Sequence, residues 1–93
     1  CLDADDVVEV QSLVDSNGVH PFTVKVEVPP HARTLLQRVK GYERLTIEAV
    51  RQGSYSLALQ ALSCHPLVPD LATAKAILDA YLAEHGDYMP ELR

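Results

Sequence analysis

The feature that most constrains the fold is a row of three helical stretches, each bounded by residues that start or stop a helix. From His31 to Gln52, apolar residues recur at steps of three and four, which predicts an amphipathic helix. Pro30 suits its first turn, where the missing N–H is not needed, and Gly53 suits a left-handed C-terminal cap. Gly41, inside this helix, costs about 1 kcal/mol relative to Ala, and so predicts close packing against another backbone. The expected buried stripe comprises Leu35, Val39, Tyr42, Leu45, Thr46 and Ala49, widened by Leu36, Ile47 and Val50.

Two further helices follow after short turns. Ser54 is a typical N-cap for a helix over Tyr55–Cys64, and because the apolar residues of this helix lie nearly all round it, we expect it to be mostly buried. Asp70 caps a third helix over Leu71–His85, which Gly86 ends. The stripe expected to be buried on this third helix comprises Leu71, Ala74, Ile77, Leu78, Tyr81 and Leu82.

The first thirty residues favour β structure instead. The β-branched run Val7–Val10 predicts a strand, and Asn17-Gly18 predicts a tight hairpin turn of type I′, which needs two positive φ angles. Val24, Val26 and Val28 alternate with charged residues and predict an edge strand or an extended segment with one buried face. The fold class is therefore α+β but mostly α, a short β-hairpin followed by three helices. A lone ribbon is only marginally stable in water, so we expect the valine-rich segments to belong to a larger sheet whose other strands are missing.

Composition narrows the class of protein. Ninety-three residues make one domain at most, and a net charge of −5 disfavours binding to nucleic acid. No apolar run approaches the roughly 18 residues that span a membrane. Two cysteines, Cys1 and Cys64, make no disulfide framework, which favours the cytoplasm. The acidic start without Met leads us to expect a chain that begins inside a longer protein.

Residues that could carry chemistry are scattered. Cys64 and His65 are soft metal-ligand types, but neighbouring side chains at a helix end point apart, so we interpret Cys64 as a small hydrophobe and His65 as a partner of the helix dipole. Arg44 and Glu48, four apart on the exposed side of the first helix, predict a solvated ion pair worth about 0.3 kcal/mol. The remaining histidines and acidic clusters are interpreted as surface, capping or solvated chain-end groups; these are His20, His31, His85, Asp3, Asp5, Asp6, Asp87 and Glu91.

Motifs for cofactors are missing as well. The four glycines never approach the G-x-G-x-x-G spacing of a phosphate loop, and no G-x-S-x-G is present. Tyr42, Tyr55 and Tyr81 are interpreted as packing residues. We therefore expect this chain to supply no catalytic residue, no cofactor-binding residue and no metal ligand.

Taken in order, several segments nonetheless form a family pattern. They are Val7-Val8-Glu9-Val10, Asn17-Gly18-Val19-His20-Pro21, Pro29-Pro30, Lys40-Gly41-Tyr42-Glu43-Arg44-Leu45, Ala49 with Gly53, Ala58-Leu59-Gln60-Ala61-Leu62, His65-Pro66-Leu67-Val68-Pro69 and His85-Gly86-Asp87-Tyr88-Met89-Pro90. On these residues the chain resembles the C-terminal region of the family 4 glycoside hydrolases, the NAD-dependent 6-phospho-glycosidases. The Tyr-Glu-Arg-Leu and His-Pro-Leu-Val-Pro pieces look most like the 6-phospho-β-glucosidase branch. Gln11 departs from the family, which usually has Pro there.

The resemblance implies a glycosidase outside the two-carboxylate scheme. Such enzymes use bound NAD to oxidise the sugar at C3 and a divalent metal, usually manganese, to polarise the ketone; a tyrosine removes the C2 proton, the aglycone is eliminated, water adds, and the ketone is reduced. The substrate would be a phosphorylated disaccharide or glucoside. Residues 1–93 would be the last part of a dehydrogenase-like C-terminal domain, with the Rossmann domain absent, so that the chain alone is inactive and has a structural role.

Two alternatives stay open from the sequence. The family resemblance also allows another specificity, for α-glucosides, α-galactosides or galacturonides. A non-enzymatic alternative is an autonomous helical interaction module. In either case we expect a homo-oligomer, with an interface drawn from Val24, Val26, Val28, Leu35, Val39 and Tyr42, because exposed apolar surface is seldom tolerated by a monomer.

Overall fold

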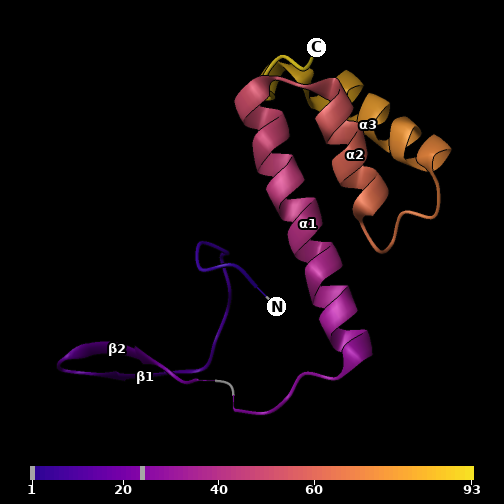
Figure 1. Cartoon of the computed structure of the whole chain (residues 1–93). Coiled ribbons are helices and arrows are strands. Elements are labelled where there is room, and N and C mark those ends of the chain that lie inside the picture. The colour runs from indigo at the N-terminus through magenta and orange to yellow at the C-terminus, as the bar shows by residue number, and fades with distance from the viewer. Residues whose placement is uncertain (1, 24) are drawn as a thin grey trace.

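A computed structural model describes residues 2–23 and 25–93 and shows a two-stranded hairpin followed by three helices (Figure 1). This confirms the expected fold class. The elements are β1 (Ser12–Asp15), β2 (Gly18–Pro21), α1 (Pro30–Gln52), α2 (Tyr55–Cys64), α3 (Leu71–His85) and a short 3₁₀ helix (Gly86–Tyr88). In the part of the chain that is described, none of the helices carries an apolar stretch long enough to cross a membrane.

The helix ends follow the sequence closely. Gly53 has φ 62° and ψ 40°, the left-handed cap expected after α1. The Ser54 hydroxyl accepts the Leu57 N–H at 3.2 Å, and the Asp70 carboxylate accepts the Thr73 N–H at 2.7 Å, as expected of N-caps. That bond to the Thr73 N–H holds the pKa of Asp70 below its usual value. These caps fix where α1 ends and where α2 and α3 begin.

The end of α3 agrees with the prediction, whereas the environment of Gly41 on α1 does not. Gly86 follows the last residue of α3, keeps a right-handed conformation and begins the 3₁₀ turn. A Cβ added to Gly41 would meet no described atom within 4 Å, so the close backbone contact predicted there is wrong for this chain. Gly41 lies on α1 beside open space.

The core is small and lies where α2 packs on α1 and α3 packs on α2. Among the described residues the buried apolar side chains are Ala49, Ala61, Val68, Ala74 and Leu78. The predicted stripes are therefore only partly buried: α2 is half-buried rather than mostly buried, and on the other two helices Leu35 and Tyr81 are exposed. Within the described ranges the backbones of α1 and α3 do not come close to each other.

The β predictions were right about the hairpin and wrong about the other strands. Residues Val7–Val10 and 25–28 are irregular, and Val24 lies outside the described residues. A strand needs a neighbour to satisfy its backbone groups, and alternating valines alone do not supply one. Of the two alternatives predicted there, the edge strand does not form over residues 25–28.

The turn of the hairpin also differs in detail. Its two loop residues are Ser16 and Asn17, because Asp15 pairs with Gly18. Of the residues described here, only glycines have positive φ, and Gly18 has φ 118°, so the type I′ assignment is wrong. The Asp15 carboxylate accepts the Asn17 N–H at 2.7 Å, a local bond that favours the observed turn.

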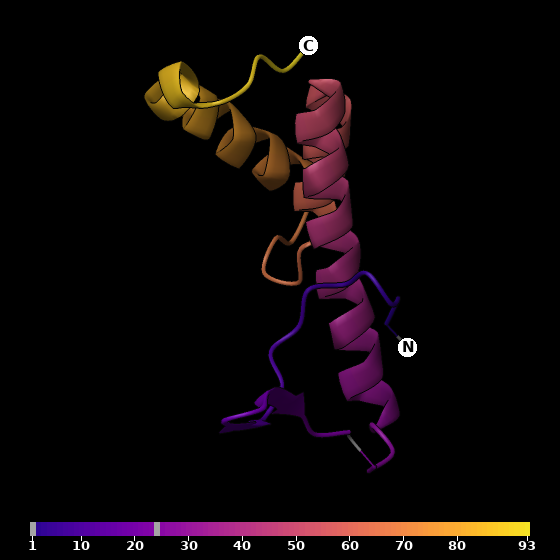
Figure 2. The same cartoon turned by 90° about the vertical axis from the view of Figure 1, so that its left-hand side faces the viewer.

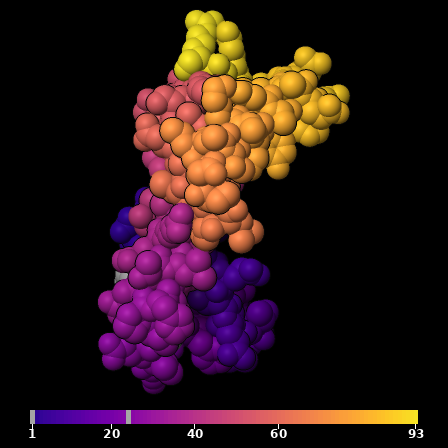
Figure 3. Space-filling view, turned by 90° about the vertical axis from the view of Figure 1, so that its right-hand side faces the viewer, coloured from indigo at the N-terminus to yellow at the C-terminus, as the bar shows by residue number. Residues whose placement is uncertain are grey.

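The molecule is extended. Its radius of gyration is 16.9 Å, against about 12 Å for a compact domain of this length. Figure 3 shows α2 and α3 gathered at one end and the first half of α1 at the other. Throughout the described ranges the hairpin packs against none of the helices and projects to one side (Figure 1).

Candidate functional site: a polar clasp on α1

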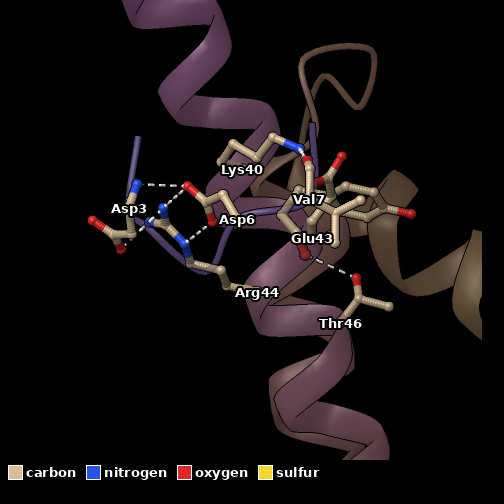
Figure 4. A network of polar contacts seen from close by, with 8 residues as sticks. Asp3, Asp6, Val7, Lys40, Glu43, Arg44 and Thr46 are labelled. Atoms are coloured by element: carbon tan, nitrogen blue, oxygen red, sulfur yellow. Dashed lines mark hydrogen bonds and ion pairs between the residues drawn. The ribbon is translucent and has the colours of Figure 1, made fainter. Parts of the chain in front are cut away.

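The most developed polar arrangement joins the N-terminal segment, defined as residues 2–10, to the middle of α1 (Figure 4). The Arg44 guanidinium binds the Asp6 carboxylate in a bidentate manner: Nε donates to Oδ1 at 2.9 Å, and a second nitrogen, Nη2, donates to Oδ2. That second nitrogen also lies 3.0 Å from a carboxylate oxygen of Asp3. The Asp6 side chain is only 6% exposed. We call this arrangement, completed by the Lys40 contacts described next, the clasp.

A second cation anchors the same segment one turn earlier on α1. Lys40 Nζ donates to the Val7 carbonyl at 2.5 Å and to Glu43 at 2.6 Å. Its side chain is 13% exposed, because the N-terminal segment covers it. Figure 2 shows this segment crossing α1. The clasp therefore ties an irregular segment to a helix without any strand pairing.

The electrostatics of the clasp favour its charged form. Hydrogen bonds from Arg44 and then from the Asp3 backbone N–H lower the pKa of Asp6. The same carboxylate raises the pKa of Arg44. Both groups are held ionised, so the clasp positions the N-terminal segment on α1 and transfers no proton.

This partnership was not anticipated from the sequence. Arg44 was predicted to pair with Glu48, but in the structure it pairs with Asp6. A carboxylate oxygen of Glu48 instead lies 3.6 Å from a guanidinium nitrogen of Arg51. A bidentate contact with a nearly buried carboxylate outcompetes a solvated pair on a helix surface. Helix spacing shows only local neighbours, and the 38 residues between Asp6 and Arg44 leave no local signal.

A cation would find poor ligands in the clasp. Asp3, Asp5 and Asp6 offer carboxylate oxygens within 4.8 Å of one another, the one such group in the described part of the chain. Two of the three already face the Arg44 guanidinium, which neutralises them and would repel a metal ion. The donor set does not fit a manganese site.

An apolar cavity of about 200 Å³ lies between α1, α2, α3 and the C-terminal tail. Its walls include Ala49, Ala61, Leu78 and Met89, together with Thr46 and two tyrosines. Its described lining residues include no Asp, Glu, His or Lys. The cavity offers shape and apolar contact, and its lining tyrosines are the residues in it that could exchange a proton.

Among the described residues, no cluster of possible metal ligands includes Cys64 or His65. Cys64 is a free, half-buried thiol, and its backbone carbonyl accepts Arg38 Nε at 2.8 Å. The His65 ring stands edge-on to Tyr42, with centroids 4.8 Å apart, and its Nδ1 accepts the Leu67 N–H at 3.1 Å. His65 is the C-cap residue of α2, the position that the predicted interaction with the helix dipole requires, and its ring also holds the turn between α2 and α3.

The other histidines lie far from one another. His20 contacts Asp15 at 3.1 Å in the hairpin, His31 is exposed in the first turn of α1, and His85 ends α3 with its ring 6.2 Å from that of Tyr81. Tyr55 donates to Asp79 at 2.6 Å, a bond that raises the pKa of this tyrosine and links α2 to α3. Asp87 and Glu91 are exposed.

The Family 4 glycosyl hydrolase C-terminal domain matches residues 1–68. The chain belongs to glycoside hydrolase family 4. Within this family it is 42% identical over 88 residues to 6-phospho-beta-glucosidase BglT of Thermotoga maritima, covering 95% of this chain and 21% of that protein. It is 39% identical over 87 residues to a probable 6-phospho-beta-glucosidase of Bacillus subtilis, covering 94% and 20%. It is also 35% identical over 92 residues to a 6-phospho-alpha-glucosidase of Leptotrichia buccalis, covering 99% and 21%.

Solved structures of family 4 proteins agree with the fold. The 6-phospho-beta glucosidase of Thermotoga maritima with NAD and glucose-6-phosphate has a TM-score of 0.74 at 39% identity, covering 88% of this chain and 19% of that one. A 6-phospho-alpha-glucosidase from gut microorganisms, in complex with NAD and Mn²⁺, has a TM-score of 0.79 at 29% identity, covering 88% and 19%. The chain spans about a fifth of the length of the family 4 relatives it matches.

Proposed function

We propose that residues 1–93 form the C-terminal, structural part of a 6-phospho-β-glucosidase that works with NAD and a divalent metal, manganese by preference. The single observation that supports β specificity is identity: the two β-glucosidase relatives are 42% and 39% identical, against 35% for the α-glucosidase. The α alternative keeps some support, since the fold matches the α-glucosidase structure with the higher TM-score.

The contribution of this chain is to hold its N-terminal segment and its helices in place. The clasp pins the N-terminal segment to α1, and the caps at Ser54 and Asp70 set the path of α2 and α3. NAD and manganese would be held by residues outside this chain, because the described residues offer no phosphate loop and no fitting donor set. We propose the same for the catalytic residues.

The extended shape supports a dependent part over an autonomous interaction module. The buried apolar side chains of the described residues are few and mostly small, and they make a weak core for a chain of this length. A module that folds and binds by itself would bring its hairpin onto its helices, and here the described hairpin stands apart.

The test is to express the complete reading frame that encodes this chain and to measure hydrolysis of matched 6-phospho-β- and 6-phospho-α-glucosides. We expect β hydrolysis that requires both NAD and manganese and exceeds α hydrolysis at least tenfold. A preference for the α substrate would overturn the specificity, and activity without NAD would overturn the cofactor assignment.

A further inference from the structure

We propose that the C-terminal tail, defined as residues 89–93, is a lid over the apolar cavity, and that it opens and closes while the three helices stay folded. Figure 2 shows the tail running from the end of α3 back toward the end of α1. Met89, Pro90 and Leu92 of the tail line the cavity together with residues of all three helices. The tail is therefore one wall of the cavity, and its release opens the cavity on that side.

Two backbone hydrogen bonds hold the tail to the turn between α1 and α2. The Arg93 N–H donates to the Gly53 carbonyl at 2.8 Å, and the Arg93 carbonyl accepts the Tyr55 N–H at 3.1 Å. Tyr55 is the first residue of α2, where a backbone N–H has no partner within its own helix. The tail supplies the acceptor that α2 lacks, which gives the closed position a defined geometry.

The side chains of the tail add only partly buried contacts. Glu91 and Arg93 pair with each other, with Nε 3.0 Å from a carboxylate oxygen, and within the described ranges neither forms an ion pair with a helix. Met89 and Leu92 are half-buried, and Tyr88, which precedes the tail, is 91% exposed. Segments with few buried contacts and little regular structure open locally at low free energy. The tail meets this description.

The helices have contacts of their own that do not involve the tail. α3 packs on α2, and the buried side chains of these two helices are Ala61, Ala74 and Leu78. The Tyr55 hydroxyl also donates to the Asp79 carboxylate on α3 at 2.6 Å. Because these contacts remain when the tail leaves, α3 keeps its place on α2. The unit that opens is the tail alone.

The closed position is the favoured one. The cavity walls that the tail covers are largely apolar, and include Ala49 and Leu78, so their contact with water is unfavourable. Gly53 allows the tail to come close, because a Cβ at that position would lie 2.9 Å from the Glu91 carbonyl oxygen. The lid is thus closed in most molecules and open in a minor population.

The experiment is amide hydrogen exchange at single-residue resolution, on the complete protein whose reading frame encodes this chain. Ser54 and Ala58 flank Tyr55, and their N–H groups donate to the carbonyls of Ala49 and Ser54. We expect the N–H groups of Tyr55 and Arg93 to have the same protection, at least tenfold below that of the two flanking groups. Equal protection of all four groups overturns the proposal, because the tail would then open only when the helices unfold. Unequal protection of Tyr55 and Arg93 also overturns it.

Two leucine truncations in the same protein test whether the cavity contact of the tail sets the opening. Leu92→Ala removes part of the cavity wall, while Leu67→Ala removes the same atoms from a side chain that is 86% exposed in the turn between α2 and α3. We expect L92A to speed exchange at Tyr55 and Arg93 about fivefold, because a half-buried leucine contributes part of the transfer free energy of a buried one. Exchange at Ser54, and all exchange in L67A, should stay within about twofold of wild type.

Three results of the truncations overturn the proposal. They are an equal rise at Ser54 in L92A, no rise at Tyr55 in L92A, and the same rise at Tyr55 in L67A. The measurement follows hydrogen exchange rather than hydrolysis, so its outcome is independent of the function proposed above.

Discussion

Gly53 and Arg93 are joined through their backbones: the Arg93 N–H donates to the Gly53 carbonyl at 2.8 Å. The Arg93 carbonyl in turn accepts the Tyr55 N–H at 3.1 Å. The C-terminal tail therefore lies against the turn between α1 and α2, and it closes one side of the apolar cavity. Gly53 has two reasons to be glycine, its positive φ and the approach of this tail.

Gly53→Ala is expected to lower the free energy of unfolding by about 1–2 kcal/mol, from the left-handed backbone alone. The added Cβ would also lie 2.9 Å from the Glu91 carbonyl oxygen, which would displace the tail. Chemical denaturation measures the change. Gly41→Ala is the matched control: it has open space at its Cβ and a helical backbone, so we expect a gain of about 0.5–1 kcal/mol. Equal effects of the two substitutions would contradict this account.

Asp6→Asn is expected to loosen the N-terminal segment, with an effect that depends on pH. The folded-state pKa of Asp6 is lowered, so its charged form stabilises the fold above the unfolded pKa, and that contribution is lost as pH falls through the folded pKa. The difference in Tm between wild type and D6N should therefore be full at pH 6 and shrink steadily below about pH 4.

Asp5→Asn controls for the change in net charge. Asp5 lines the same surface as Asp6, but among the described contacts it makes no hydrogen bond to Arg44. We expect its Tm to stay close to that of wild type at every pH. If D5N and D6N behave alike, charge number rather than the clasp sets the stability.

Leu78→Ala should be the most damaging single truncation in the helices. Leu78 is 4% exposed and faces the apolar cavity, so its loss is expected to cost about 2–4 kcal/mol. Leu71→Ala on the same helix removes the same atoms from a side chain that is 61% exposed, and should cost less than about 1 kcal/mol. Urea melts of both variants make the comparison, and a smaller loss for L78A than for L71A would contradict the packing described.

The helices were predictable because their signals are local. Ser54, Asp70 and Gly53 cap or terminate helices through bonds to residues at most four positions away, so the sequence contains both partners. The strand expected over Val7–Val10 was not predictable in this way, because its formation depends on a neighbouring strand distant in sequence or outside the chain. β propensity alone led to the wrong assignment.

The clasp could not be predicted from the sequence for a related reason. Arg44 has Glu48 at helix spacing and Asp6 far away, and only the path of the N-terminal segment decides between them. The burial of α2 was overestimated because apolar content says how much surface a helix would cover, not whether a partner is present to cover it. Both predictions were wrong because they depend on partners that are distant in the sequence.

The isolated 93-residue chain is expected to bind neither NAD nor manganese. The described residues lack a phosphate loop, and the acidic group around Asp6 is already engaged by Arg44. Isothermal titration calorimetry with each ligand should give no saturable heat up to about 1 mM. Stoichiometric binding at micromolar affinity would contradict the proposal that the cofactor and metal sites lie outside this chain.

The most direct measurement is the activity of chimeric enzymes in which this chain replaces the matching C-terminal region of two relatives, the β-glucosidase BglT and the Leptotrichia buccalis α-glucosidase. If the chain is a structural part without catalytic residues, each chimera should hydrolyse its own 6-phospho-glucoside, and the same enzymes truncated before this region should be inactive. Retention of each relative's anomeric preference, with kcat within about tenfold of the parent (about 1.4 kcal/mol in barrier), is the predicted result. Full activity of the truncated enzymes, or a switch of the α-glucosidase chimera to β substrates, would contradict it.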